Sequence, residues 1–215
     1  MHVISVNVGL PREVIWKGQR VTTGIYKAPV EGRVLMRTLN LDGDRQADLS
    51  VHGGPDKAVY VYRAEHYEYW SRELAGLELP WGMFGENLTT EGLREGSVSI
   101  GDRLRVGTAE VVVTQPRMPC YKMGIKFGRD DMVHRFLDSG RSGFYCAVLR
   151  EGEVGARDAI EWIDRDRHQV SVADIHRLYV SERKSLELLA RAIRVESLPE
   201  GWKEHFRRQI ERLKG

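Results

Sequence analysis

The sequence predicts a mainly β protein of the α+β class, in which a strand-rich domain of residues 1–165 precedes a small helical appendage of residues 166–215. Short apolar runs alternate with glycines up to about residue 164, a pattern typical of strands joined by tight turns. From about residue 166 the apolar residues recur at the helical period instead. A chain of 215 residues is long enough for one main core with an appendage.

The expected strands have short apolar runs in common, and they cover residues 2–8, 33–38, 58–62, 98–100, 104–106, 110–114, 144–149 and 159–163. Glycines between them, such as Gly43, Gly101 and Gly107, suit tight turns because glycine tolerates a positive φ. We expect these strands to form a curved, largely antiparallel sheet or barrel. Two helices, over residues 64–75 and 131–139, interrupt the strands and carry apolar side chains on one face.

Three helices are expected in the appendage. Ser171 and Asp174 have the spacing of a capping box, which satisfies free amides at a helix start, and Val172 and Ile175 follow at helical spacing. A second helix is expected over residues 186–195. The last helix should be amphipathic, with a buried stripe made of Trp202, Phe206, Ile210 and Leu213.

The charge and the N-terminus restrict the partners and the location. A formal net charge of +2, with both signs mixed through residues 166–215, gives no large basic field, so we expect no nucleic-acid binding and no membrane partner. The N-terminus lacks the pattern of a signal peptide, and no segment approaches the ~18 apolar residues of a membrane span. The sequence therefore predicts a cytoplasmic protein.

Two cysteines occur without paired spacing, which supports neither a disulfide framework nor a zinc or iron–sulfur site built from cysteines. Cys120 follows an apolar strand and two prolines that stiffen its loop, and Arg117 and Lys122 place positive charge nearby, which favours a thiolate. Cys120 is therefore a candidate nucleophile or metal ligand, although a small packing residue is the alternative. Cys146 lies within an apolar run and is expected in the core.

Two polar loops are further candidates. His52, Gly53, Gly54 and Lys57 place two glycines between a histidine and a lysine, an arrangement that can hold an anion such as phosphate. A hairpin turn with surface His52 and Lys57 explains the same residues. In the second loop, the amide of Asn87 can both donate and accept hydrogen bonds to a polar heterocycle, but asparagine is also common in turns.

Several familiar motifs do not occur in the sequence. It contains no Gly-x-Gly-x-x-Gly after a strand, no Walker phosphate loop and no Gly-x-Ser-x-Gly elbow. None of the seven histidines has a recognisable spacing to Cys120. Dinucleotide-dependent, serine-hydrolase and cysteine-hydrolase chemistry are therefore unsupported.

Five segments taken together resemble a MOSC domain, and they occur in the order seen in that family: residues 22–27, 43–48, 52–59, 84–88 and 115–120. The resemblance covers most of residues 1–165. The helical appendage resembles the three-helix extension of the YiiM-like group within that family. The resemblance implies a MOSC-type β-barrel with peripheral helices and a small C-terminal three-helix appendage.

The resemblance further implies that the chain binds a molybdenum cofactor, with Cys120 as the metal ligand and catalytic residue. A thiolate on a stiff loop beside positive charge suits such a soft metal. Asn87 and the backbone of its loop would contact the pterin. The remaining candidates for the pterin phosphate or the pocket wall are Thr22, Thr23, Lys27, Arg45, His52, Gly53, Gly54, Lys57, Gly85 and Arg117.

The implied activity is the reduction of N-hydroxylated compounds, such as N-hydroxylaminopurines, to amines. The sequence shows no dinucleotide, haem or iron–sulfur motif, so the electrons are expected to come from a separate reductase. The alternative is a carrier of the cofactor or a sulfur-handling protein, in which Cys120 bears a persulfide. A nucleic-acid module in the appendage is a third possibility, which its near balance of charge disfavours.

Overall fold

A computed structural model describes residues 1–47, 53–181 and 185–214 of the chain. Its main sheet contains eight strands among these residues, in the order β12 (Ile160–Asp164), β8 (Arg103–Val106), β9 (Ala109–Pro116), β10 (Phe144–Arg150), β6 (Val59–Arg63), β7 (Leu88–Glu91), β1 (His2–Val8) and β4 (Ala28–Pro29). Neighbouring strands pair antiparallel except β6 and β7, which are parallel.

The sheet closes on itself. Val3 N donates to Asp158 O at 2.9 Å, and Arg157 N donates to Val3 O at 2.8 Å, so β1 is joined to the segment that leads into β12. The interior is filled by apolar side chains from the alternating faces of the strands, including Val6, Leu104 and Val113. The β-rich barrel expected from the sequence is therefore confirmed.

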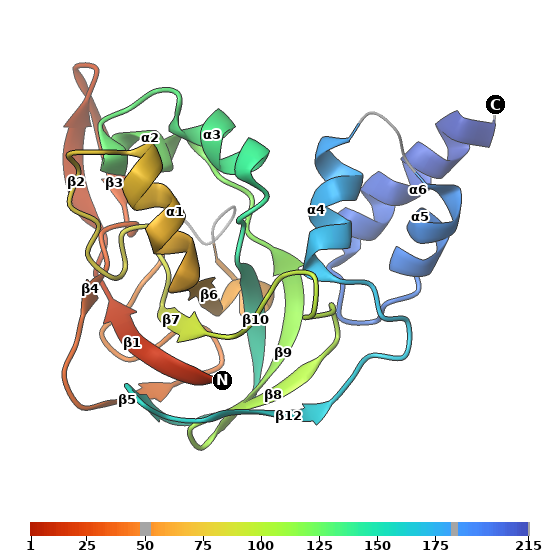
Figure 1. The fold of residues 1–215 in the computed structure, drawn as a ribbon, viewed down its shortest axis with the longest axis horizontal. Coiled ribbons are helices and arrows are strands. Elements are labelled where there is room, and N and C mark those ends of the chain that lie inside the picture. Colours follow the sequence, from red (N-terminus) through yellow and green to blue (C-terminus); the bar gives the residue numbers. More distant parts are fainter. Residues whose placement is uncertain (48–52, 182–184, 215) are drawn as a thin grey trace.

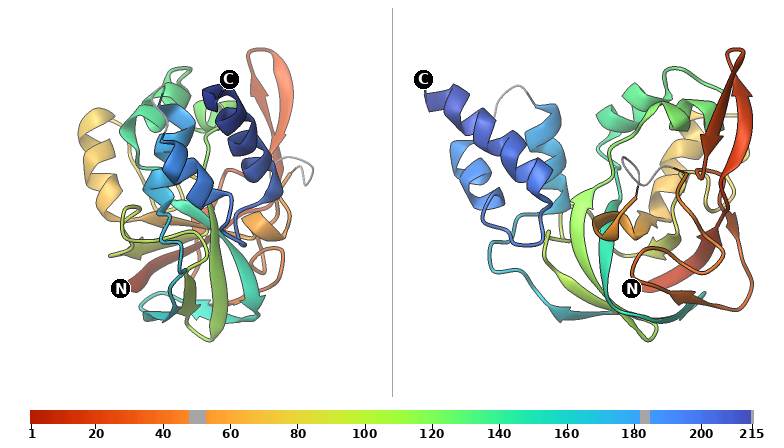
Figure 2. Two further views of the ribbon diagram at one scale, coloured as in Figure 1. Left: turned by 90° about the vertical axis from the view of Figure 1, so that its right-hand side faces the viewer. Right: turned by 180° about the vertical axis from the view of Figure 1, so that it is seen from behind.

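Two smaller strand pairs flank the barrel. β2 (Arg12–Trp16) and β3 (Gln19–Thr23) form a hairpin, and β5 (Arg33–Met36) pairs with β11 (Gly152–Gly155). The hairpin and the C-terminal helices lie on opposite sides of the barrel (Figures 1 and 2). Pairing with β11 ends at Met36, so the strand expected over residues 33–38 is two residues shorter.

Short helices gather over one end of the barrel (Figure 1): α1 (Glu65–Glu73), α2 (Tyr121–Phe127) and α3 (Met132–Ser139). They pack on a second core cluster, which is largely aromatic and includes Tyr62, Trp70, Phe84 and Phe136. Trp70 Nε1 donates to the Tyr62 hydroxyl at 2.7 Å. This packing fixes α2, the helix that starts directly after Cys120.

The appendage contains α4 (Val172–Val180), α5 (Leu186–Ala192) and α6 (Glu200–Lys214). The capping box at Ser171 is present, since Asp174 N donates to Ser171 Oγ at 3.0 Å and Ser171 N donates to the Asp174 carboxylate at 3.1 Å. Phe206 of α6 belongs to the same apolar cluster as the barrel interior. The helices therefore share a core with the barrel and are held against it.

Two expectations from the sequence were wrong. Residues 98–100 do not form a strand: Ser99 makes one isolated bridge to Ser171, and Ile100 N donates to Val170 O at 2.9 Å. The backbone at these positions bonds to residues 170–171 of the appendage, although the side chains are buried as in a strand. Leu213 is 48% exposed, so the buried stripe of α6 ends before it. Within the described ranges, every helix is too short or too polar to span a bilayer.

Candidate functional site

Cys120 lies in the short loop between the end of strand β9 and the start of α2. It precedes α2 in an extended conformation, with φ −127° and ψ 171°, and its side chain is partly buried. β9 is paired on both sides, by β8 and β10, so the loop that carries Cys120 leaves a rigid part of the barrel. Cys146, in contrast, is completely buried on β10, and burial raises the pKa of its thiol. Of the two cysteines, Cys120 is therefore the one that a ligand can reach.

A partly open pocket lies beside Cys120. Among the residues that the structure describes, cationic side chains line it and no carboxylate does: the cations are Lys27, Arg45, Lys57, Arg117 and Lys122. Several backbone segments and the rings of Tyr60 and Tyr145 complete the wall. Such a lining favours an anionic, partly aromatic ligand, because the positive charges attract the anion while the rings offer flat apolar surface.

Arg117 is the buried cation closest in sequence to Cys120. Its guanidinium carbon lies 5.4 Å from the centre of the Tyr60 ring, and its Nη1 donates to Met118 O at 3.2 Å. Burial opposes the charge, but the pKa of Arg117 is raised overall through Tyr145, Tyr60 and Cys120. Its Nε is buried and has no hydrogen-bond partner within the described part of the chain. A buried donor without a partner is costly, so this position suits a bound anion.

A buried polar network supports the pocket wall. Asp44 is 2% exposed, and it accepts hydrogen bonds from Lys27 Nζ, from Asn87 Nδ2 at 2.8 Å and from Gly9 N at 3.0 Å. Asn87 Oδ1 in turn accepts from Tyr60 N at 3.0 Å. Burial lowers the pKa of Lys27, and the adjacent Asp44 opposes this shift. The side chain of Asn87 is therefore engaged within the fold and positions the pocket wall.

A second buried network lies behind the first. The Glu86 carboxylate accepts from the Tyr67 hydroxyl, from Gly82 N at 2.8 Å and from the Thr89 hydroxyl at 2.9 Å. Burial raises the pKa of Glu86. Lys126 on α2 donates to Gly82 O at 2.6 Å and to Ile25 O at 3.0 Å, and burial lowers its pKa to about 8. These contacts tie α2 to the loops that form the pocket.

Two glycines permit the close approach of backbone segments at the pocket. A side chain at Gly24 would place its Cβ 2.5 Å from Arg45 O, and one at Gly85 would place it 2.9 Å from Ile25 Cγ1. Gly85 also has a positive φ of 82°, which other residues rarely adopt. Both glycines line the pocket, and the absence of a side chain lets the neighbouring segments pack closely there.

The structure brings together most of the residues that the sequence singled out. The pocket is lined by Thr23, Lys27, Arg45, Lys57, Gly85, Asn87, Arg117 and Cys120. Thr22 is exposed on β3 and does not line it, and Gly53 and Gly54 line a neighbouring groove instead. His52 lies outside the described residues. Sequence reasoning missed Asp44 and Lys126, whose roles depend on contacts between distant segments.

The donor set fits a molybdenum cofactor in chemical type. A thiolate at Cys120 is a soft ligand suited to molybdenum, and the surrounding cations suit a phosphorylated pterin. The unpartnered Nε of Arg117 supplies an additional buried donor beside them. Lys27 and Lys57 both line the pocket, although they come from segments far apart in the sequence.

Comparison with known proteins agrees with this architecture. Residues 48–161 match the model of the MOSC domain, and residues 170–213 match a YiiM-like 3-alpha helix domain. The protein YflK of Bacillus subtilis is 41% identical over 98% of this chain and 95% of its own length. The protein YiiM of Escherichia coli is 41% identical over 66% of this chain and 65% of its own length.

Solved structures show the same fold. The crystal structure of YiiM from Geobacillus stearothermophilus has a TM-score of 0.81 and 33% sequence identity, covering 97% of this chain and 98% of that one. A fungal protein named Reductase, from Gibberella moniliformis, is 32% identical over 80% of this chain, which spans only 31% of that protein. The chain therefore belongs to the MOSC domain family, in the group that carries a YiiM-like three-helix domain.

Proposed function

We propose that this chain binds a molybdenum cofactor through Cys120 and reduces N-hydroxylated compounds, such as N-hydroxylaminopurines, to amines. The observation that carries the proposal is the buried, unpartnered Nε of Arg117 in a cation-lined pocket that also contains Cys120. MOSC domains as a family are associated with this cofactor. The relative named Reductase supports an oxidoreductase activity.

The residues of the pocket have distinct roles in this proposal. Cys120 holds the metal through its thiolate, and the rigid end of β9 keeps the sulfur in place. Lys27, Arg45 and Lys57 bind the phosphate of the pterin, while the backbone at Gly85 contacts its ring system. Arg117 stabilises the negative charge that accumulates beside Cys120, because its guanidinium is buried and charged.

The reaction consumes two electrons and two protons, cleaves the N–O bond and releases an amine and water. When bound, the cofactor supplies the two-electron chemistry for this cleavage. The protein binds the substrate and holds the cofactor in one orientation. The electrons come from a separate reductase. The proposal places the reaction in the cytoplasm, where thiols such as those of Cys120 and Cys146 stay reduced.

The test is anaerobic reduction of 6-hydroxylaminopurine by protein expressed in a host that makes molybdenum cofactor, with reduced viologen as electron donor. We expect turnover by the wild type, loss of turnover in Cys120→Ser, and full turnover in Leu213→Ala, a matched control at an exposed site on α6. NADH alone should not support turnover. Wild-type turnover in Cys120→Ser would overturn the proposal. A wild-type protein that shows no turnover and carries stoichiometric sulfane sulfur on Cys120 would also overturn it and would favour the sulfur-handling alternative.

A further inference from the structure

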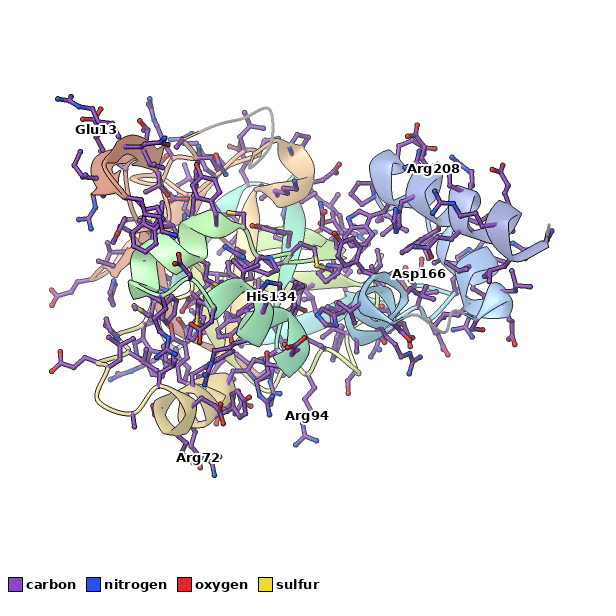
Figure 3. All side chains as sticks on the ribbon, turned by 90° about the horizontal axis from the view of Figure 1, so that it is seen from above. Glu13, Arg72, Arg94, His134, Asp166 and Arg208 are labelled. Atoms are coloured by element: carbon purple, nitrogen blue, oxygen red, sulfur yellow. The ribbon has the colours of Figure 1, made fainter. Side chains whose placement is uncertain are left out.

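A second concave site lies between the barrel and the C-terminal helices. It is an open groove, and the side chains that define it include Lys57, Gln115, Tyr179, Trp202, His205 and Arg208. The 3-10 helix η1 (Pro55–Lys57) forms one wall, and residues of α4 and α6 form the other. Seen from above, η1 and α6 lie toward the same side of the molecule, with Arg208 on α6 (Figure 3).

Aromatic rings give this groove a built surface. The ring centres of Tyr179 and Trp202 are 5.5 Å apart with an interplanar angle of 66°, and those of Tyr179 and His205 are 5.8 Å apart. Tyr179 remains 46% exposed, so its ring is available to a ligand. Flat rings fixed by their neighbours bind a planar partner at low cost in conformational entropy.

The groove is anchored to the strand that leads into Cys120. Trp202 Nε1 donates to Gln115 Oε1 at 2.8 Å, and Gln115 lies near the end of β9. This bond spans 87 residues of sequence and fixes the indole of α6 relative to the barrel. The aromatic wall therefore keeps a defined position relative to the loop that holds Cys120.

The groove adjoins the pocket beside Cys120, because Lys57 lines both. The pocket is lined by cations that suit an anionic cofactor, whereas the groove combines aromatic rings with the polar groups of Gln115 and Arg208. The two sites thus differ in chemistry and meet at one side chain. This arrangement fits two ligands that approach each other at Lys57.

We infer that the groove binds the planar aromatic ring of an N-hydroxylated substrate, so that the N-hydroxyl group passes Lys57 and reaches the pocket at Cys120. This inference rests on the proposed function and names the substrate class: N-hydroxylated aromatic rings and heterocycles. Tyr179 contacts the ring face, and Trp202 limits its orientation. The C-terminal helices therefore determine specificity, whereas the barrel carries the reaction.

The test compares two substrates that have the same number of carbon atoms, the planar N-phenylhydroxylamine and the non-planar N-cyclohexylhydroxylamine, under anaerobic conditions with reduced viologen. In Tyr179→Ala we expect kcat/KM for the phenyl compound to fall about 3- to 10-fold, mainly through KM, because a stacking contact is lost. For the cyclohexyl compound, kcat/KM should change less than about twofold, because a non-planar ring does not stack on the tyrosine. Leu213→Ala, on the far part of α6, should match the wild type for both.

A binding experiment separates this inference from the proposed function. Ligand-observed NMR with N-phenylhydroxylamine measures binding without turnover, and melting curves check that each variant is folded. Binding that depends on Tyr179 without any reduction would retain the groove and reject the reductase. Reduction of the phenyl compound that is unaffected by Tyr179→Ala, or equal losses for both compounds, would overturn the groove. A changed KM for a donor reductase alone would show a protein-docking surface and also overturn it.

Discussion

Removing the carboxylate of Asp44 should destabilise the protein strongly. Asp44→Ala leaves Lys27 without its ion-pair partner, and the side chain of Lys27 is only 8% exposed, so its charge stays buried. The substitution also removes the acceptor of the hydrogen bonds from Asn87 Nδ2 and Gly9 N. Breaking a buried ion pair in this way costs about 3–5 kcal/mol. For a chain of this size that loss corresponds to a decrease in Tm of about 6–20 °C. Cofactor retention should fall with it, because Asp44 positions Lys27 and Asn87 at the pocket wall.

A double-mutant cycle tests the physical reason. Lys27→Met alone should cost about 1–3 kcal/mol, since Asp44 keeps its bonds to Asn87 and Gly9. Lys27→Met with Asp44→Ala should be more stable than the sum of the single losses predicts, by about 1–3 kcal/mol. Urea denaturation followed by circular dichroism gives the free energies of unfolding. Losses that add within about 0.5 kcal/mol would refute a direct coupling between the two side chains.

Other substitutions separate stability from cofactor binding. Cys146→Ser should cost about 1–3 kcal/mol, because the hydroxyl enters an apolar core, and an unchanged urea midpoint would contradict this. Lys126 has a folded-state pKa of about 8, below its ordinary 10.5, so the unfolded chain binds more protons between these values and the free energy of unfolding rises with pH across that window. Lys126→Met should lose this rise of roughly 3 kcal/mol, whereas the exposed control Lys214→Met should keep it. Equal slopes of the free energy of unfolding between about pH 8 and about pH 10.5 in the wild type and both variants would contradict this role of Lys126. Lys57→Ala should weaken pterin retention about 10- to 100-fold at an unchanged Tm. Asn87→Ala should lower both pterin retention and Tm, because its amide is bonded within the fold. Wild-type pterin occupancy after dialysis in both variants would count against the assigned pocket.

Local patterns predicted many of the strands and helices that bury apolar residues, but not β7, whose Leu88 is buried. The run at residues 110–114 became part of β9, and the helical spacing after Ser171 became α4. The hairpin of β2 and β3 escaped prediction because most of its side chains are exposed, so its sequence lacks a strong apolar alternation. α2 was missed because it is short, contains Gly124 and directly follows the proline-stiffened loop.

The candidate site could be predicted only where residue type and local sequence carry the information. Cys120, Arg117 and Lys57 stand out through charge, proline or glycine in neighbouring positions, and the structure places all three at one pocket. Asp44 and Lys126 gave no such signal. Their partners, Asn87 and Gly82, lie more than forty positions away in the sequence, so the contacts arise only from the folded barrel.

The role of Cys120 as the metal ligand is tested most directly by the molybdenum content per chain of protein purified from a host that makes the cofactor. Mass spectrometry of the metal should find close to one molybdenum in the wild type and in Cys146→Ala, in which the buried thiol is absent. Cys120→Ser should remain folded but lose the metal, because a serine hydroxyl does not provide a soft thiolate ligand. A folded Cys120→Ser protein with wild-type molybdenum content would contradict the assignment.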